Sequence, residues 1–221
     1  LSTVLIPRSS YYLEKKMFAE FDSLSQKSLD YIYLISIPLT VIVFAFSHEI
    51  TLLIFGKSFL PSSMTLKITS LMIIPLVINY YIGLQIMYPK GEDFKVFAAS
   101  ILTGLFNIVS NLIFIPLLSY NGPAISGLLS QLCFFAVLVF YKKNYNVEIL
   151  KSGGVFKYLT VSLLLIIWIT AIKKLIHEDI LRMLIGSTFF IILYILSLLT
   201  FRDKTMIEIK NIIIEKFSRI T

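Results

Sequence analysis

The sequence predicts an all-α fold, a polytopic membrane helix bundle of about six transmembrane helices, from its composition and from the spacing of its charges. Hydrophobic residues make up 57% of the 221 residues, charged residues make up 15%, and the mean hydropathy is +0.86. Soluble domains are less apolar and more charged than this. The stretches 31–47, 68–89, 96–141, 158–172 and 183–201 contain no Asp, Glu, Lys or Arg. Because a helix needs roughly 20 apolar residues to cross a bilayer, these stretches predict membrane spans.

The longest uncharged stretch, 96–141, is too long for one span and predicts two. A tight turn is indicated in its middle by Pro116, Asn121, Gly122 and Pro123. We therefore expect spans at 29–47, 67–88, 95–116, 122–141, 158–176 and 181–200. The first four form one unit, 29–141, and a linker over 142–157 that contains Ser152, Gly153 and Gly154 separates it from a final pair, 158–200.

The flanking charges predict the orientation of these spans. Of the 20 Lys and Arg residues, only five flank one side of the predicted bundle, namely Lys57, Lys67, Lys173, Lys174 and Arg182, and the other 15 flank the opposite side. The positive-inside rule assigns the richer side to the cytoplasm, which places both ends of the chain there. Since topology accounts for the net charge of +7, the composition does not indicate nucleic-acid binding.

Amphipathic segments precede and follow the spans. Within 1–28, the end of a preceding helix is followed by a stripe of Leu13, Met17, Phe21 and Leu24, which predicts a helix lying in the cytoplasmic interface. The tail, 201–221, repeats the pattern with Met206, Ile209, Ile213, Phe217 and Ile220. We expect it to lie on membrane lipids, and a helix docked on a partner protein is the alternative.

Polar residues inside the spans are candidates for a substrate cavity, because an unpaired polar group is costly in hydrocarbon. Ser100, Gly104, Asn107 and Asn111 recur at intervals that place them on one helix face. The preceding span adds Asn79, Tyr80, Tyr81 and Gln85. These amide, hydroxyl and aromatic groups suit a carbohydrate, and hydrogen bonding between helices is the alternative explanation.

Small residues and prolines predict packing and bending. Gly122, Ser126 and Ser130 form a stripe that lets another helix approach closely, which favours helix packing. Pro38 and Pro75 lie inside spans, where each removes a backbone donor and can act as a hinge or produce a static bend.

The sequence gives no indication of catalysis, a metal or a cofactor. The single Cys133 lies inside a span, and His48 and His177 lie at span edges without grouped carboxylates or thiols. Glycine-rich nucleotide-binding motifs are absent.

Two stretches resemble a known transporter family. The string from Asn107 to Pro116 and the string from Gly122 to Ser126 are similar to the asparagine, isoleucine-proline and glycine-alanine-isoleucine pattern of polysaccharide biosynthesis flippases (Wzx type) of the multidrug/oligosaccharidyl-lipid/polysaccharide exporter superfamily. Further matches are Pro7, Arg8, Pro38, Ile54, Phe55, Gly56 and Phe59. The chain departs from the pattern at Ser119, where glycine is frequent, and at Pro123, where alanine is usual.

The resemblance implies that the chain is the carboxy-terminal part of a fourteen-helix transporter, helices nine to fourteen, without its amino-terminal half. It implies export of an undecaprenyl-pyrophosphate-linked oligosaccharide across the bacterial inner membrane, with the missing half and polysaccharide assembly proteins as partners. No charged residue is expected within the membrane, which argues against ion coupling in this segment.

Three other functions remain open at this stage. A multidrug antiporter of the same superfamily would need a coupling carboxylate, and a membrane polymerase or ligase would need a large outer loop. A membrane remnant or scaffold that does not transport is the third.

Overall fold

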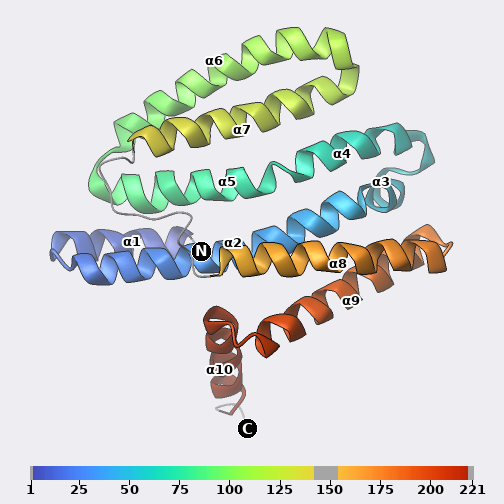
Figure 1. Cartoon of the computed structure of the whole chain (residues 1–221). Coiled ribbons are helices and arrows are strands. Elements are labelled where there is room, and N and C mark those ends of the chain that lie inside the picture. The colour runs from blue at the N-terminus through green and yellow to red at the C-terminus, as the bar shows by residue number, and fades with distance from the viewer. Residues whose placement is uncertain (1, 142–153, 219–221) are drawn as a thin grey trace.

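The described residues of the computed structural model, 2–141 and 154–218, form an all-helical bundle (Figure 1). Its α-helices are α1 (Ser2–Glu14), α2 (Phe18–Ala45), α3 (Ser47–Phe55), α4 (Ser63–Ser70), α5 (Ile73–Tyr80), α6 (Asp93–Leu118), α7 (Gly122–Tyr141), α8 (Val155–Leu175), α9 (Asp179–Thr200) and α10 (Lys204–Ser218). Short connecting turns are the 3₁₀ segments η1 (Lys57–Ser62), η3 (Tyr88–Lys90) and η4 (Ser119–Asn121), and η2 (Tyr81–Met87) is a π-helix. The predicted fold class is confirmed.

The long helices account for the predicted spans. Among the described residues, four stretches are long and apolar enough to cross a membrane: Phe18–Ala45, Asp93–Tyr141, Val155–Leu175 and Asp179–Thr200. A fifth is the bent pair Lys57–Ser70 and Ile73–Lys90. Because Asp93–Tyr141 consists of α6 and α7, which fold back on one another (Figure 1), counting these two separately gives six spans.

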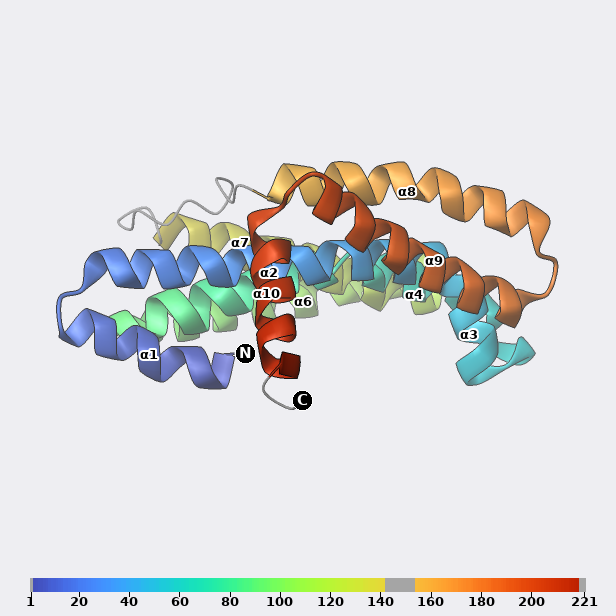
Figure 2. The ribbon, with the colours of Figure 1, turned by 90° about the horizontal axis from the view of Figure 1, so that it is seen from below.

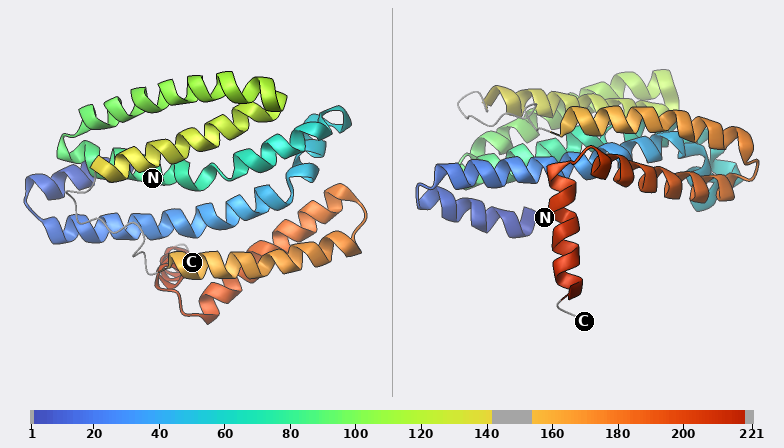
Figure 3. Two further views of the ribbon diagram at one scale, coloured as in Figure 1. Left: turned by 45° about the horizontal axis from the view of Figure 1, so that its top comes forward. Right: turned by 60° about the horizontal axis from the view of Figure 1, so that its bottom comes forward.

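Helix α2 lies at the centre of the bundle. It packs against α4 and α5 on one side and against α8 on the other, so that α4 to α7 and the α8–α9 hairpin flank it (Figure 3). Residues 142–153, most of the predicted linker between these two groups, lie outside the described residues.

The first two helices form a hairpin where the sequence predicted one interfacial helix. The stripe that includes Leu13 and Phe21 is divided, because α1 ends at Glu14 and α2 begins at Phe18. Lys16, in the turn, has a φ of 57°, which reverses the chain. Phe21 is 1% exposed, and the Lys90 ammonium lies 5.2 Å from its ring centroid. The apolar stripe is thus partly explained by packing between helices.

The two candidate hinge prolines have different surroundings. Pro75 lies in the first turn of α5, just after a break at which the helical pair bends by about 40°. A bend is expected there because Pro75 cannot donate a hydrogen bond to the carbonyl of Leu71. Pro38 lies inside the continuous helix α2, and the carbonyl of Leu34 that it leaves free accepts a hydrogen bond from the Tyr194 hydroxyl of α9 at 3.1 Å.

The amphipathic tail forms α10, which runs across the direction of the long helices (Figure 2). Buried Asp203 accepts the Met206 backbone N–H at its start and also accepts hydrogen bonds from Lys157 and Tyr158 of α8, each at 3.1 Å. An ion pair of 2.8 Å joins Glu208 of α10 to Lys27 of α2. Since Met206 and Ile209 pack against the core, part of the apolar face of α10 is covered by the bundle itself.

Candidate functional site

A groove runs along the surface where α5 and η2, α6 and α7 meet. It consists of two adjoining hollows of about 430 Å³ and about 370 Å³, which share Ser100, Gln131 and Phe134. The first is also lined by Met72, Thr103, Gly104, Asn107, Gly127 and Ser130, and the second by Leu76, Asn79, Tyr80, Gly83, Leu84, Tyr88 and Val96. Four of the seven cavity candidates therefore line one groove: Asn79, Tyr80, Ser100 and Asn107.

A chain of hydrogen bonds connects the polar stripe of α6 to α7. The Asn111 amide donates to the Asn107 side-chain carbonyl at 2.9 Å, and the Asn107 amide donates to the Ser130 hydroxyl at 2.9 Å. Ser130 in turn donates to the backbone carbonyl of Ser126 at 2.7 Å. Two of these links follow the i, i+4 spacing of one helix, and the Asn107–Ser130 link joins α6 to α7, so the amides of the stripe are held in fixed orientations.

Asn79 joins the opposite wall of the groove to α7. Its amide donates both to the backbone carbonyl of Gln131, at 3.0 Å, and to the Gln131 side-chain carbonyl, at 2.9 Å. The Oδ1 atoms of Asn79 and Asn111 are buried and accept no hydrogen bond from the described residues. Asn79 lines the groove, so its Oδ1 is available to a ligand hydroxyl there, since a buried acceptor gains most from a partner.

Tyr80 supplies an aromatic surface to the same wall. Its side chain is 58% exposed, and it lines the hollow together with Tyr88. A ring that is free on one side can stack on the apolar face of a sugar while neighbouring amides bind the hydroxyls.

The other three cavity candidates line neither hollow: Asn111, which donates to Asn107, and Tyr81 and Gln85, which are directed elsewhere. Tyr81 and Gln85 are 2% and 3% exposed and line neither hollow. The Tyr81 hydroxyl donates to the backbone carbonyl of Ser25 in α2 at 3.0 Å. Both residues belong to the π-helix η2, whose wider turn changes the angular position of each side chain relative to an α-helix. The sequence-based grouping assumed a regular α-helix there.

The small-residue stripe of α7 lies at the contact with α6. A Cβ on Gly122 would lie 2.5 Å from the Phe114 carbonyl oxygen, so this position requires glycine. Ser126 and Ser130 are buried. Ser130 was predicted from the sequence to serve helix packing. In the structure it serves packing and also lines the groove.

Among the described residues, those that line the groove include no amine and no carboxylate. Its polar lining consists of amides, hydroxyls and phenols, and the described residues contain no group of three or more His, Cys, Asp or Glu able to hold a metal ion. Such a lining can exchange hydrogen bonds with a neutral polar ligand, but it cannot neutralise a phosphate.

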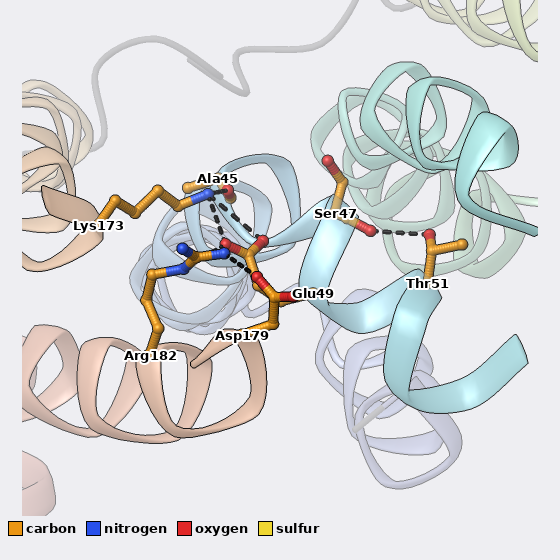
Figure 4. A network of polar contacts seen from close by, with 7 residues as sticks. All are labelled: Ala45, Ser47, Glu49, Thr51, Lys173, Asp179 and Arg182. Carbon is orange, nitrogen blue, oxygen red and sulfur yellow. Dashed lines mark hydrogen bonds and ion pairs between the residues drawn. The ribbon is translucent and has the colours of Figure 1, made fainter. Parts of the chain in front are cut away.

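An ionic cluster that sequence reasoning missed lies at one end of the bundle (Figure 4). Glu49 of α3 is 1% exposed, and its Oε1 lies 3.0 Å both from the Lys173 ammonium of α8 and from Arg182 Nε of α9. Lys173 also donates to the Ala45 carbonyl at the end of α2, and Arg182 also pairs with Asp179. In the sequence, Glu49 lies just beyond the predicted span 29–47, where a charged residue indicates a loop.

This ionic cluster joins four helices at one corner of the bundle. Its partners are separated by 124 residues or more, so no local pattern signals the contact; only the i, i+3 spacing of Asp179 and Arg182 is visible in the sequence. Beside it, Phe46 is fully buried against α9, where a Cβ on Gly186 would lie 2.5 Å from the Phe46 ring. This ionic corner, formed by Glu49, Lys173, Asp179 and Arg182, therefore fixes the α8–α9 hairpin to α2 and α3.

Neutral hydrogen-bonding groups held between apolar spanning helices are typical of a transporter for a polar solute. A family model described as "Lipid II flippase MurJ" matches residues 1–196. The chain belongs to the lipid II flippase MurJ family. No curated protein and no solved structure matches the chain.

Membership of the MurJ family identifies the chain as a flippase of lipid-linked precursors. It is thus a multi-pass membrane protein and a transporter rather than an enzyme. The expectations of a flippase and of no catalytic role are thereby confirmed. The family match does not distinguish a flippase of polysaccharide repeat units, which the motifs resemble, from a flippase of lipid II. The matched residues include the whole groove and the ionic corner, whereas α10 lies beyond them.

Proposed function

We propose that this chain is part of a flippase that moves an undecaprenyl-pyrophosphate-linked saccharide from the inner to the outer leaflet of the bacterial cytoplasmic membrane. The observation that supports the proposal is the groove between α5, α6 and α7, with its neutral amides and hydroxyls. A sugar that leaves water loses its hydrogen bonds, and each unreplaced bond is costly. Asn79 and Asn107, which line the groove, supply replacements while the lipid tail stays in the bilayer.

The groove is suited to the sugar and not to the pyrophosphate. Its lining carries no cation, so the charged group of the substrate would be met by other residues of the transporter. We infer that the transporter includes a further helical lobe, the amino-terminal half implied by the resemblance. Alternating access moves two lobes about a site near the bilayer midplane, and the groove would form one wall of that site.

Two lipid-linked saccharides are candidates for the transported substrate. The family model names lipid II, whereas the motifs around Asn107 and Gly122 resemble flippases of polysaccharide repeat units. A strain depleted of its lipid II flippase and a strain lacking its repeat-unit flippase distinguish them. When the chain is co-expressed with the amino-terminal half, growth restored in the first strain identifies lipid II, and polysaccharide export restored in the second identifies the repeat unit.

The groove favours a flippase over a multidrug antiporter of the same superfamily. An antiporter needs a carboxylate that can exchange ions, and the groove has none. Glu49 does not supply one, because two cations already neutralise it.

The test of the groove is the double substitution Asn107→Leu and Asn111→Leu. It keeps helix α6 and removes both amides. We expect flipping to fall by about tenfold or more, since two lost hydrogen bonds of about 1 kcal/mol each contribute about 2 kcal/mol. The measurement is substrate accessibility in the outer leaflet, normalised to the amount of protein in the membrane. Asn211→Leu, at an exposed position of α10, is the matched control. Undiminished flipping by the double variant would show that the stripe serves packing alone. Failure in both strains even when the chain is co-expressed with the amino-terminal half would favour a remnant or scaffold.

The proposed orientation places both ends of the chain in the cytoplasm. It is supported by the excess of Lys and Arg on that side. A single Cys at position 57, in a variant without Cys133, should react with an impermeant thiol reagent in intact cells, and one at position 210 should not. The reverse pattern would overturn the orientation.

A further inference from the structure

A further hollow, of about 370 Å³, lies between α2, α4 and α8, and it shares no lining residue with the groove. Most of its length, here called the aliphatic trunk, is lined by apolar side chains, among them Val41, Leu71, Leu163, Ile166 and Ile169. Lys67 and Lys173 line its end, next to Ala45 at the end of α2. This hollow is therefore apolar along its length and cationic at one end.

The α8 wall of the hollow is about as long as one leaflet of a bilayer, and the walls on α2 and α4 cover residues 40–45 and 67–71. Along α8 its lining extends from Leu163 to Lys173, ten residues later in the sequence. At 1.5 Å per residue this is about 15 Å, half of the roughly 30 Å of the hydrocarbon core. Leu163 on the rim is 58% exposed, so the hollow opens on a surface that faces lipid chains.

The cationic end carries an uncompensated positive charge. Lys67 has no ion pair within the described residues, and its ammonium lies 4.7 Å from the ring centroid of Phe44, which directs it toward the hollow. Lys173 belongs to the ionic corner. There, the two positive charges of Lys173 and Arg182 are matched by the two negative charges of Glu49 and Asp179. The positive charge of Lys67 is not matched by this cluster.

We propose that this hollow binds an anionic diacyl phospholipid, with one acyl chain along the aliphatic trunk and the phosphate at Lys67 and Lys173. An apolar hollow whose α8 wall is about one leaflet long, with two lysines at one end, is complementary to such a lipid. The ligand is a resident lipid of one leaflet and not the transported substrate, so the inference is independent of the proposed function. Its role is to hold α4 and α8 together beside the ionic corner.

The test measures lipid retention by the purified full chain in detergent, with native mass spectrometry as the readout. Phosphatidylglycerol, phosphatidylethanolamine and undecaprenyl phosphate are titrated separately. We expect phosphatidylglycerol to bind more tightly than phosphatidylethanolamine. Lys67→Gln should weaken phosphatidylglycerol about fivefold, because one lysine at a membrane surface contributes about 1 kcal/mol. Lys57→Gln is the control, since Lys57 is exposed outside the hollow at the same end of the bundle.

A second variant tests the trunk without changing charge. Ile166→Trp fills the hollow and should reduce retention of both phospholipids, with the fold of each variant verified by its elution volume and thermal stability. Equal retention of the two phospholipids by the unmodified chain, or equal losses in the Lys67 and Lys57 variants, would overturn the proposal. Preferential retention of undecaprenyl phosphate would also overturn it, because the hollow would then belong to the transported lipid.

Discussion

Replacing Glu49 by Gln keeps the shape of the side chain and removes the charge on which the ionic corner depends. Lys173 and Arg182 then face a neutral amide in a site where the residue at position 49 is 1% exposed. Breaking a buried ion pair typically costs about 3–5 kcal/mol. The lower end applies here, because Lys173 keeps the Ala45 carbonyl and Arg182 keeps Asp179. We therefore expect a loss of about 3 kcal/mol in the free energy of unfolding.

The assay for this prediction is thermal unfolding of the purified chain in detergent. For a chain of this size, about 3 kcal/mol corresponds to a fall of roughly 6–12 °C in Tm. Glu178→Gln, an exposed carboxylate on the same side of the bundle, should leave Tm unchanged. In a double-mutant cycle with Arg182→Gln, the combined loss should be smaller than the sum of the single losses. A Glu49 variant as stable as the Glu178 variant would refute the reasoning that the corner is held by charge.

Three further substitutions test local features of the bundle. Tyr194→Phe should cost about 1 kcal/mol in unfolding free energy, measured by the same assay, because Pro38 provides no replacement donor for the Leu34 carbonyl; an unchanged Tm would show that this carbonyl needs no partner. Gly122→Ala should lower membrane abundance by separating α6 from α7, whereas Gly104→Ala, with open space around it, should be neutral or stabilising; equal effects of the two would contradict the close approach. Ser119→Gly should raise Tm, because Ser119 has φ 51° and ψ −130°, a conformation that only glycine adopts without strain, and a lowered Tm would exclude strain at this turn.

The spans could be predicted from the sequence because hydropathy is a local property that each lipid-exposed helix must satisfy by itself. The predicted turn near 116–123 corresponds to η4 between α6 and α7. The side-by-side placement of Asn107 and Asn111 was predictable for a related reason, since α6 is one regular helix and its spacing alone brings the two amides together. Ser119, a departure from the family pattern, coincides with the turn in which a positive φ is needed.

Contacts between distant helices were decided only by the tertiary structure. Tyr81 and Gln85 resembled the other cavity candidates in chemistry, yet the π-helix η2 turns them away from the groove. Glu49 looked like a loop carboxylate because its cations lie more than 120 residues along the chain. Periodicity fixes which residues share a face of one helix. It does not fix which face meets which neighbour, since that depends on how side chains from separate helices fill a common volume and satisfy one another's charges.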